Sequence, residues 1–243
     1  MINLYVMNVS PFEDSLLFSK GLTLIDEERQ DKVNKLKRED AKRLSLGAGL
    51  LLMFGLNYAL EQGNDLEETN LKSEIENEPV LVHFQAENLV NHLVMTDNQK
   101  AFQYKYGEHG KPYIAGNKPI HFSLSHSGEY VFLAVSDREI GADIHQMKEV
   151  DFDKLAKHFM TEDELKRWQV ETPEIKRELF YRIWAGKEAY LKLTGEGMTA
   201  GFQTVYYEES GQTMVDGRTP NNEIEIFWGS MDNYQFAVCR AKA

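Results

Sequence analysis

Apolar residues recur at near-helical intervals in an early segment, from about residue 26 to about residue 60. The first half of this segment is charged and the second half is largely apolar. The recurring apolar positions are Val33, Leu36, Leu44 and Leu51. This spacing predicts a long helical stretch with one buried face. Gly47 and Gly49 weaken the case for a single unbroken helix, since glycine is a poor residue for a helix interior.

The segments on either side differ from it in their pattern of apolar, charged and turn residues. The opening MINLYVMNVSPFED has a short apolar run without a basic leader, so it predicts a first strand and is not typical of a signal peptide. Residues 61–78 carry many acidic side chains against a single lysine, and we expect a solvated loop or insertion there. Between residues 101 and 145, short apolar runs alternate with turn residues such as Gly110-Lys111-Pro112, which indicates strands and turns.

The second half predicts helices followed by strands. Thr161 to Glu164 fits a capping box that opens a helix. A longer helix is predicted over about residues 174–194, where Gly195 stands at the position of a C-terminal cap. From about residue 204 to residue 240 the pattern is one of strands separated by turns. The predicted class is α+β.

Composition narrows the class of protein. With 42% hydrophobic and 27% charged residues among 243, the chain is typical of a soluble globular protein, and no stretch approaches the roughly 20 apolar residues of a membrane helix. The net charge of −12 argues against general nucleic-acid binding, which depends on clustered cations. The single cysteine, Cys239, excludes an internal disulfide and favours the cytoplasm. Its apolar surroundings favour a core position over a nucleophile.

The strand predicted over residues 138–146 brings polar side chains together. Ile140, Ala142 and Ile144 alternate with Gly141, Asp143 and His145. Since successive side chains of a strand point to opposite faces, Asp143 and His145 project together, beside a glycine that leaves room for a ligand. The alternative is an edge strand whose polar face meets water.

The predicted long helix carries a second polar set. Trp184, Glu188 and Lys192 are spaced i, i+4 and i+8 and therefore share one helical face. A surface Glu–Lys pair is the simple explanation, worth a few tenths of a kcal/mol. However, the neighbouring aromatic residues indicate partial burial, which is costly for charges unless they are paired or bound to an ion. A glutamate beside a lysine suits a metal-binding carboxylate and a phosphate-binding cation.

These two motifs, GADIH and WAGKEAYLK, resemble the signature of the 4′-phosphopantetheinyl transferase superfamily. The resemblance is to its larger, monomeric type, which activates peptide synthetases and polyketide synthases. Three upstream elements extend it, namely a basic segment over residues 37–43, Gly110 to Tyr113, and the FSLSHSG sequence at residues 122–128. The acidic residues 61–78 have no counterpart that we can align.

The resemblance implies the following chemistry. Asp143 and Glu188 would bind Mg²⁺, or Mn²⁺, at the pyrophosphate of coenzyme A, and oxygen ligands suit such hard ions. Glu188 would also be the general base that takes the proton of a carrier-protein serine, directly or through a water. Lys192 would hold a phosphate oxygen and stabilise the charge of the transition state. The products would be the holo carrier protein and 3′,5′-ADP.

The resemblance also implies contacts for the adenine end and 3′-phosphate of coenzyme A. They would come from Arg43, Lys111 with Pro112, Ser125 and His126. Two of these residues have simpler explanations, because His126 could cap its turn and Arg43 could be a solvated residue on a charged helix. One position departs from the pattern. His145 stands where many members of this type have a third acidic ligand, and imidazole is a poor magnesium ligand. We include His145 as a candidate metal residue.

The implied fold has two similar α+β halves related by a pseudo-twofold axis, with the ligand cleft between them. We place the N-terminal half at residues 1–137 and the C-terminal half, with the metal and catalytic residues, at residues 138–243. The implied partner is an apo acyl or peptidyl carrier protein, and a monomer is expected, with no nucleic acid or membrane partner. Two rival readings are an inactive member that only binds coenzyme A or a carrier domain, and a different magnesium-dependent enzyme of nucleotides or pyrophosphates.

Overall fold

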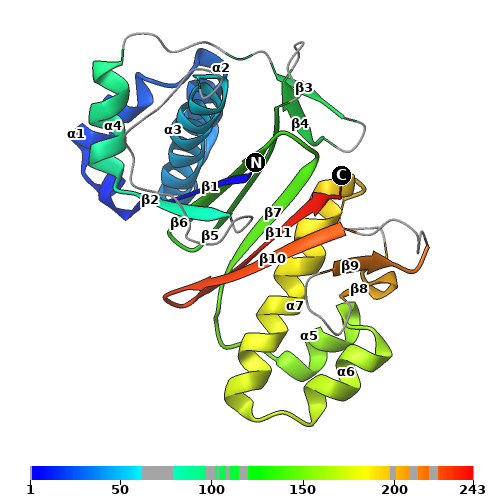
Figure 1. The fold of residues 1–243 in the computed structure, drawn as a ribbon. Coiled ribbons are helices and arrows are strands. Elements are labelled where there is room, and N and C mark those ends of the chain that lie inside the picture. Colours follow the sequence, from blue (N-terminus) through cyan, green and yellow to red (C-terminus); the bar gives the residue numbers. More distant parts are fainter. Residues whose placement is uncertain are drawn as a thin grey trace. The chain divides into compact units, whose positions relative to one another are not determined.

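The computed structural model describes residues 2–61, 79–96, 102, 104–107, 110–114, 120–197, 201–207, 213–218 and 224–242. The chain forms two compact units (Figure 1). The first contains Met1–Lys105 and Ile114–Asp137, and the second contains Tyr106–Tyr113 and Arg138–Ala243. The half predicted over residues 1–137 therefore contains a segment, Tyr106–Tyr113, that belongs with the second unit. This segment contains the last residue of β3 (Tyr104–Tyr106) and the first residues of β4 (Pro112–Ile114), two strands that form a short two-stranded sheet.

The first unit is built on a four-stranded sheet in the order β2-β1-β6-β5. Its strands are β1 (Ile2–Asn8), β2 (Val80–Phe84), β5 (His121–Ser127) and β6 (Tyr130–Ser136). β1 is parallel to β2 and antiparallel to β6, which forms a hairpin with β5. The predicted first strand is confirmed. Its apolar side chains lie in a core together with those of the helices.

Among the described residues of the first unit, five helical segments accompany this sheet. They are η1 (Ser10–Glu13), α1 (Ser15–Leu22), α2 (Glu27–Lys35), α3 (Glu39–Glu61) and α4 (Ala86–Met95). α3 packs against β1, β5 and β6, and α1 and α4 contact it as well. A Cβ on Gly47 would lie 2.5 Å from a methyl carbon of Val9, so this glycine permits the close approach of α3 to the chain that follows β1.

The predicted long helix is in fact two helices, and the break is not at its glycines. α2 ends at Lys35, Leu36 is extended, and α3 begins at Glu39. The reason is tertiary: Val33 becomes fully buried because α2 folds against α3. The sequence also led us to expect no stretch of membrane-helix length, and α3 corrects this expectation. Over Glu39–Leu60 it is long and apolar enough to cross a membrane, judged by length and composition alone. Half of its most apolar 18-residue part is buried inside the protein, as in a core helix.

The second unit is built on a five-stranded sheet in the order β7-β11-β10-β9-β8. Its strands are β7 (Ile140–Gln146), β8 (Val205–Tyr207), β9 (Thr213–Asp216), β10 (Ile224–Met231) and β11 (Tyr234–Ala241). All neighbouring strands are antiparallel. The helix α7 (Pro173–Thr194) crosses this sheet and contacts β7, β11 and β10 (Figure 1).

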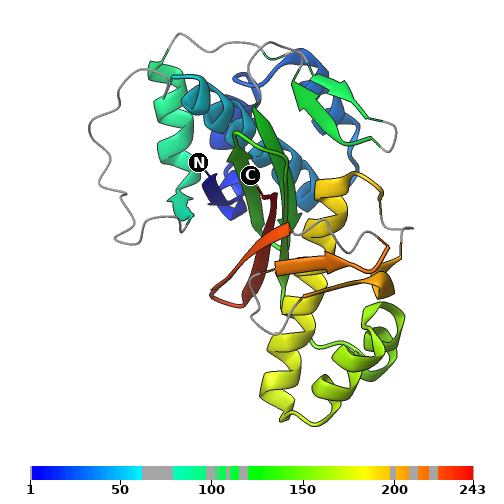
Figure 2. The same cartoon turned by 45° about the vertical axis from the view of Figure 1, so that its right-hand side comes forward.

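Two shorter helices, α5 (Phe152–Phe159) and α6 (Glu162–Gln169), pack beside α7, and η2 (Phe202–Thr204) contacts α5 (Figure 2). The predicted capping box is confirmed, because Thr161 and Glu164 each accept a hydrogen bond from the other's backbone N–H. Gly195 caps α7 in the left-handed conformation, with φ of 73°, as the sequence predicted. Cys239 is a fully buried core residue, also as predicted.

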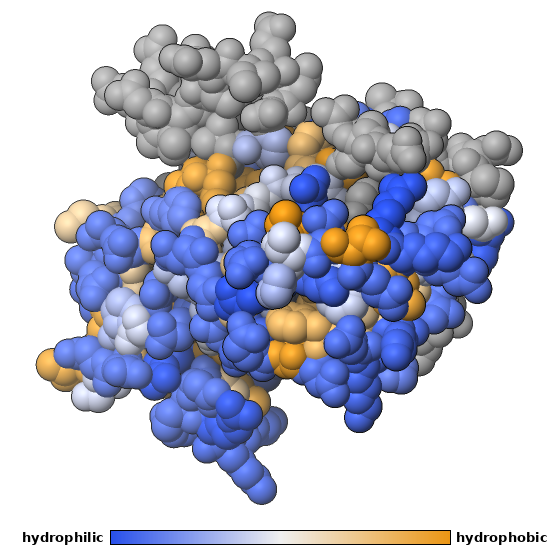
Figure 3. Space-filling view, turned by 90° about the horizontal axis from the view of Figure 1, so that it is seen from below, coloured by the Kyte–Doolittle hydropathy of each residue, from blue (hydrophilic) through white to orange (hydrophobic). Residues whose placement is uncertain are grey.

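The α+β class is therefore confirmed, whereas the pseudo-twofold relation stays a prediction. The acidic stretch predicted as a loop falls almost wholly on residues 62–78, which lie outside the described residues, as do most of the turns predicted after residue 207. On the face drawn in Figure 3, hydrophilic residues predominate and hydrophobic ones form small separate areas.

Candidate active site

β7 presents the polar face that its alternation predicted. Asp143 is 3% exposed and His145 is half-buried, and the two side chains are neighbours on the face that meets α7. The glycine beside them has a different role from the one expected. A Cβ on Gly141 would lie 2.0 Å from the carbonyl oxygen of Ala189 and 2.3 Å from the backbone nitrogen of Leu193. Gly141 therefore makes room for the backbone of α7, not for a ligand.

α7 contributes the second half of the cluster. Glu188 is 7% exposed, and Lys192, one turn later, donates from Nζ to Asp143 Oδ1 at 2.6 Å. The other oxygen of Asp143, Oδ2, lies 2.7 Å from His145 Nε2. Trp184 completes this face, because its ring meets the His145 ring edge-on with centroids 5.9 Å apart. The partial burial predicted for the Trp184–Glu188–Lys192 face is thus confirmed.

The pKa values of the two carboxyl groups, Asp143 and Glu188, are shifted in opposite directions. Burial raises the pKa of Glu188, and the nearby charge of Asp143 raises it further, although Lys192 and His145 act in the other direction. Burial also acts to raise the pKa of Asp143, but Lys192 and His145 outweigh it and hold that pKa below its ordinary value. Asp143 is therefore the anionic centre of the cluster, and Glu188 is the group that takes up a proton more readily.

The donor set bears on the predicted metal ion. Two buried carboxyl groups raise each other's energy when both are ionised, and Glu188 Oε1 is buried with no hydrogen-bond partner among the described residues. This arrangement suits a hard cation. However, within the described ranges no three His, Cys, Asp or Glu side chains converge on a preformed metal centre. The observations fit Asp143 and Glu188 as ligands, while the ligand role of His145 stays a prediction.

Lys111 lies in the second unit, at the end of α7. Its ammonium group donates to the carbonyl oxygens of Leu193 at 2.8 Å and Ile140 at 3.3 Å. Burial lowers the pKa of this lysine, while Glu139 acts to raise it. Lys111 thus satisfies a carbonyl left open at the C-terminus of α7. Its neighbour Pro112 begins β4 and is half-buried.

The remaining predicted contacts belong to the first unit. Arg43 on α3 pairs with Glu13, with 3.4 Å between Nη2 and Oε1, so it is not simply solvated. Ser125 and His126 are consecutive residues of β5, and the serine is buried while the histidine is exposed. The turn itself follows at Gly128, which has φ of 56°. The coenzyme A roles of these residues stay predictions.

The burial of Lys187 could not be read from the local sequence. Lys187 directly precedes Glu188, is 1% exposed, and pairs with Glu164 at 2.6 Å. Its helical position lies outside the Trp184–Glu188–Lys192 face, and nothing local distinguishes it from a solvated lysine. The only available signal was its place inside the WAGKE motif.

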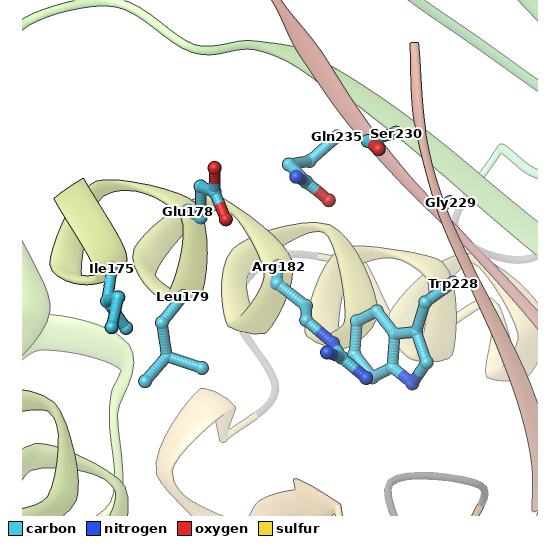
Figure 4. Close-up of a pocket in the computed structure, with 8 residues that line it drawn as sticks. All are labelled: Ile175, Glu178, Leu179, Arg182, Trp228, Gly229, Ser230 and Gln235. Carbon is cyan, nitrogen blue, oxygen red and sulfur yellow. The ribbon is translucent and has the colours of Figure 1, made fainter.

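A separate groove of about 370 Å³ lies in the second unit, between α7 and the β10–β11 hairpin (Figure 4). Arg182 lies over the ring of Trp228 there, 4.9 Å from its centroid. The other lining residues are Ile175, Glu178, Leu179, Gly229, Ser230 and Gln235. None of the residues predicted for the site from the sequence lines this groove.

Part of the chain is similar to known proteins. Residues 139–239, which contain the whole β7–α7 cluster, match the model of the 4′-phosphopantetheinyl transferase superfamily. The chain is 36% identical to the 4′-phosphopantetheinyl transferase psf-1 of Bacillus pumilus, over 55% of this chain and 58% of that protein. It is 32% identical to a 4′-phosphopantetheinyl transferase of Bacillus subtilis, over 55% and 61%. With AcpT of Salmonella typhimurium the identity is 39%, over 55% and 65%.

The chain thus spans about three fifths of the length of these curated relatives. Residues 139–239 thus match the 4′-phosphopantetheinyl transferase superfamily, as the motifs predicted, and the relatives are consistent with its larger type.

Proposed function

We propose that this protein is a 4′-phosphopantetheinyl transferase, which moves the phosphopantetheine arm of coenzyme A onto a serine hydroxyl of an apo carrier protein. The observation that carries the proposal is the cluster of Asp143, Glu188 and Lys192, which β7 and α7 bring together inside the family-matched segment. The chemistry needs a base, a cation for phosphate and anionic ligands for a divalent ion, and this cluster offers all three.

Asp143 and Glu188 would hold Mg²⁺, and Mn²⁺ is a second candidate. When bound, the ion would neutralise charge on the pyrophosphate and on the departing 3′,5′-ADP. His145 is positioned to orient Asp143, since its Nε2 lies 2.7 Å from Asp143 Oδ2. We propose this orienting role for it alongside the ligand role predicted from the family pattern.

The protein's own groups would act as follows. Glu188 accepts the proton of the serine hydroxyl as the serine oxygen bonds to the β-phosphorus of coenzyme A. The bond from that phosphorus to the bridging oxygen breaks, and 3′,5′-ADP leaves with the bonding electrons. A raised pKa makes Glu188 a better proton acceptor than an ordinary carboxylate. Lys192 holds a phosphate oxygen whose charge grows in the transition state.

The binding of coenzyme A and of the carrier follows the family resemblance. We propose that Arg43, Lys111, Pro112, Ser125 and His126 contact its adenine end and 3′-phosphate. Two similar halves would then share the ligand, in a monomeric protein of the cytoplasm. The net charge of −12 repels an acidic carrier at long range, so we expect docking to depend on a local basic or apolar area.

An inactive coenzyme A-binding or carrier-binding member is the second candidate. The observation that favours it is the close contact of His145 with Asp143, which engages one of the two oxygens that a metal ion would need. The intact set of Asp143, Glu188 and Lys192 argues for the transferase.

The test is to incubate the protein with coenzyme A, Mg²⁺ and an apo carrier domain, and to measure the intact mass of the carrier. A gain of one phosphopantetheine group, lost in Glu188→Gln and retained in Glu178→Gln, establishes the transferase. Glu178 is an exposed residue of the same helix and serves as the matched control. No gain with several carrier types, together with calorimetric binding of coenzyme A, refutes the transferase and favours the inactive member.

A further inference from the structure

Lys187 is a buried lysine beside the proposed base, and the mechanism above gives it no role. We propose that it is a positioning residue, which orients the active site through contacts on its outer side and touches neither coenzyme A nor the carrier. The inference rests on the proposed function, because it concerns the orientation of Glu188 and of the Asp143–His145 pair.

The ammonium group of Lys187 has three oxygen partners. It donates to Glu164 Oε2 at 2.6 Å, to the carbonyl of Phe159 at 2.7 Å and to the carbonyl of Phe202 at 2.9 Å. An ammonium group has three N–H donors, so all of them are used. The side chain is also only 1% exposed. Lys187 therefore has no donor to offer a phosphate group, although it stands next to Glu188 in the family motif.

The three oxygens come from three different elements. Phe159 is the last residue of α5, Glu164 lies in the first turn of α6, and Phe202 begins η2. Glu164 Oε2 also accepts the backbone N–H of Thr161 at 2.8 Å, which closes the capping box of α6. Lys187 thus fixes the ends of three elements to α7, at the residue that precedes Glu188.

Two of these partners, Phe159 and Phe202, also contact Trp184 of the candidate active site. The ring of Phe202 stacks on Trp184, with centroids 5.4 Å apart, and the ring of Phe159 meets Trp184 edge-on at 4.8 Å. Trp184 in turn contacts His145, whose Nε2 lies beside Asp143. The two residues whose carbonyls bind Lys187 are therefore the residues whose rings enclose Trp184. We call Lys187, Phe159, Glu164 and Phe202 the lysine cage.

A buried ion pair is weak evidence for stability, since an apolar pair of similar volume often serves equally well. The lysine cage does what an apolar pair does not, because its hydrogen bonds set the directions of two backbone segments. Those segments hold the aromatic contacts of Trp184, so loss of the cage should loosen Trp184 and His145 and alter the angle at which α7 presents Glu188.

The test compares Lys187→Met with the double variant Lys187→Met/Glu164→Gln. The single variant leaves Glu164 buried without its cation and serves only to measure the loss of stability. The double variant removes that charge and keeps an acceptor for the N–H of Thr161, so it is the variant for kinetics. Lys176→Met, on the same helix and outside the cage, is the control.

We expect the folded double variant to lose at least tenfold in kcat for carrier modification, while KM for coenzyme A stays within twofold. A second measurement does not depend on activity. With 5-fluorotryptophan incorporated at the three tryptophans, and the Trp184 resonance assigned through Trp184→Phe, the double variant should shift or broaden that resonance and leave that of Trp228 in place.

A folded double variant with unchanged kcat and an unchanged Trp184 resonance overturns the proposal. A KM for coenzyme A that rises at constant kcat also overturns it, because it indicates direct contact with the ligand. If the wild-type protein shows no transfer, the proposed function fails, and the Trp184 resonance then decides the positioning role alone: a shift supports it and an unchanged signal refutes it.

Discussion

Replacement of Glu188 by glutamine is expected to stabilise the folded protein at neutral pH in the absence of a divalent ion, although it removes the proposed base. Glu188 is 7% exposed, and its Oε1 is buried without a hydrogen-bond partner among the described residues. Its raised pKa, caused by burial and by Asp143, means that the fold disfavours its ionised form. Glutamine carries no charge, so its burial avoids this electrostatic cost.

The magnitude follows from these observations. A buried polar group without a partner costs about 1–3 kcal/mol. Lys192 and His145 offset part of this cost. We therefore expect Glu188→Gln to raise the free energy of unfolding by about 1–2 kcal/mol at pH 8.

The sign of the pH dependence can be stated. Because the folded-state pKa of Glu188 is raised, its favourable contribution is complete below the unfolded-state value of 4.5 and is lost as pH rises through the folded-state pKa. The advantage of the glutamine variant should thus be small near pH 4.5 and complete at pH 8. Urea unfolding followed by circular dichroism at pH 4.5, 6 and 8 measures it, and Glu178→Gln should stay within about 0.5 kcal/mol of wild type.

The same unfolding measurements in the presence of Mg²⁺ test whether Glu188 is a metal ligand. An ion bound only by the folded state at 100 times its Kd stabilises that state by about 2.7 kcal/mol, so the wild type should gain and the glutamine variant should gain far less. A variant less stable than wild type at pH 8, or an advantage independent of pH, would refute the electrostatic reasoning. Equal stabilisation of both proteins by Mg²⁺ would refute Glu188 as a ligand.

Three further outcomes are expected. Gly141→Ala should lower the free energy of unfolding by about 2–3 kcal/mol in urea titrations, because its Cβ would lie 2.0 Å from a carbonyl oxygen of α7. A loss no larger than that of Gly107→Ala would contradict the close approach of β7 and α7. Lys111→Met should cost about 1 kcal/mol by the same measurement, because the Leu193 carbonyl loses its donor, and unchanged stability would exclude the helix-capping role. Cys239 is fully buried, and this burial raises the pKa of its thiol. It should therefore react with a thiol reagent only after the protein is unfolded in guanidinium. Fast reaction of the native protein would show that the core is open.

Local features of the sequence determined several parts of this structure. The capping box at Thr161, the cap at Gly195 and the alternation from Ile140 to His145 each depend on a few neighbouring residues. Helix and strand periodicity then determines which side chains share a face. For that reason the sequence alone placed Asp143 with His145, and Glu188 with Lys192. The motifs also predicted the superfamily whose model residues 139–239 match.

Tertiary structure alone decided what those faces meet. The end of α2 near Leu36 depends on the burial of Val33 against α3, and Gly141 serves the backbone of α7, a partner about fifty residues away. Lys111 and Lys187 are ordinary lysines in the sequence, yet each has oxygen partners distant along the chain. Burial and charge pairing depend on contacts between remote segments, and no local pattern encodes them. The sequence by itself therefore determined which groups the site contains. The packing of α7 on β7 decided their distances and the directions of their pKa shifts, and the packing of α5, α6 and η2 on α7 buried Lys187.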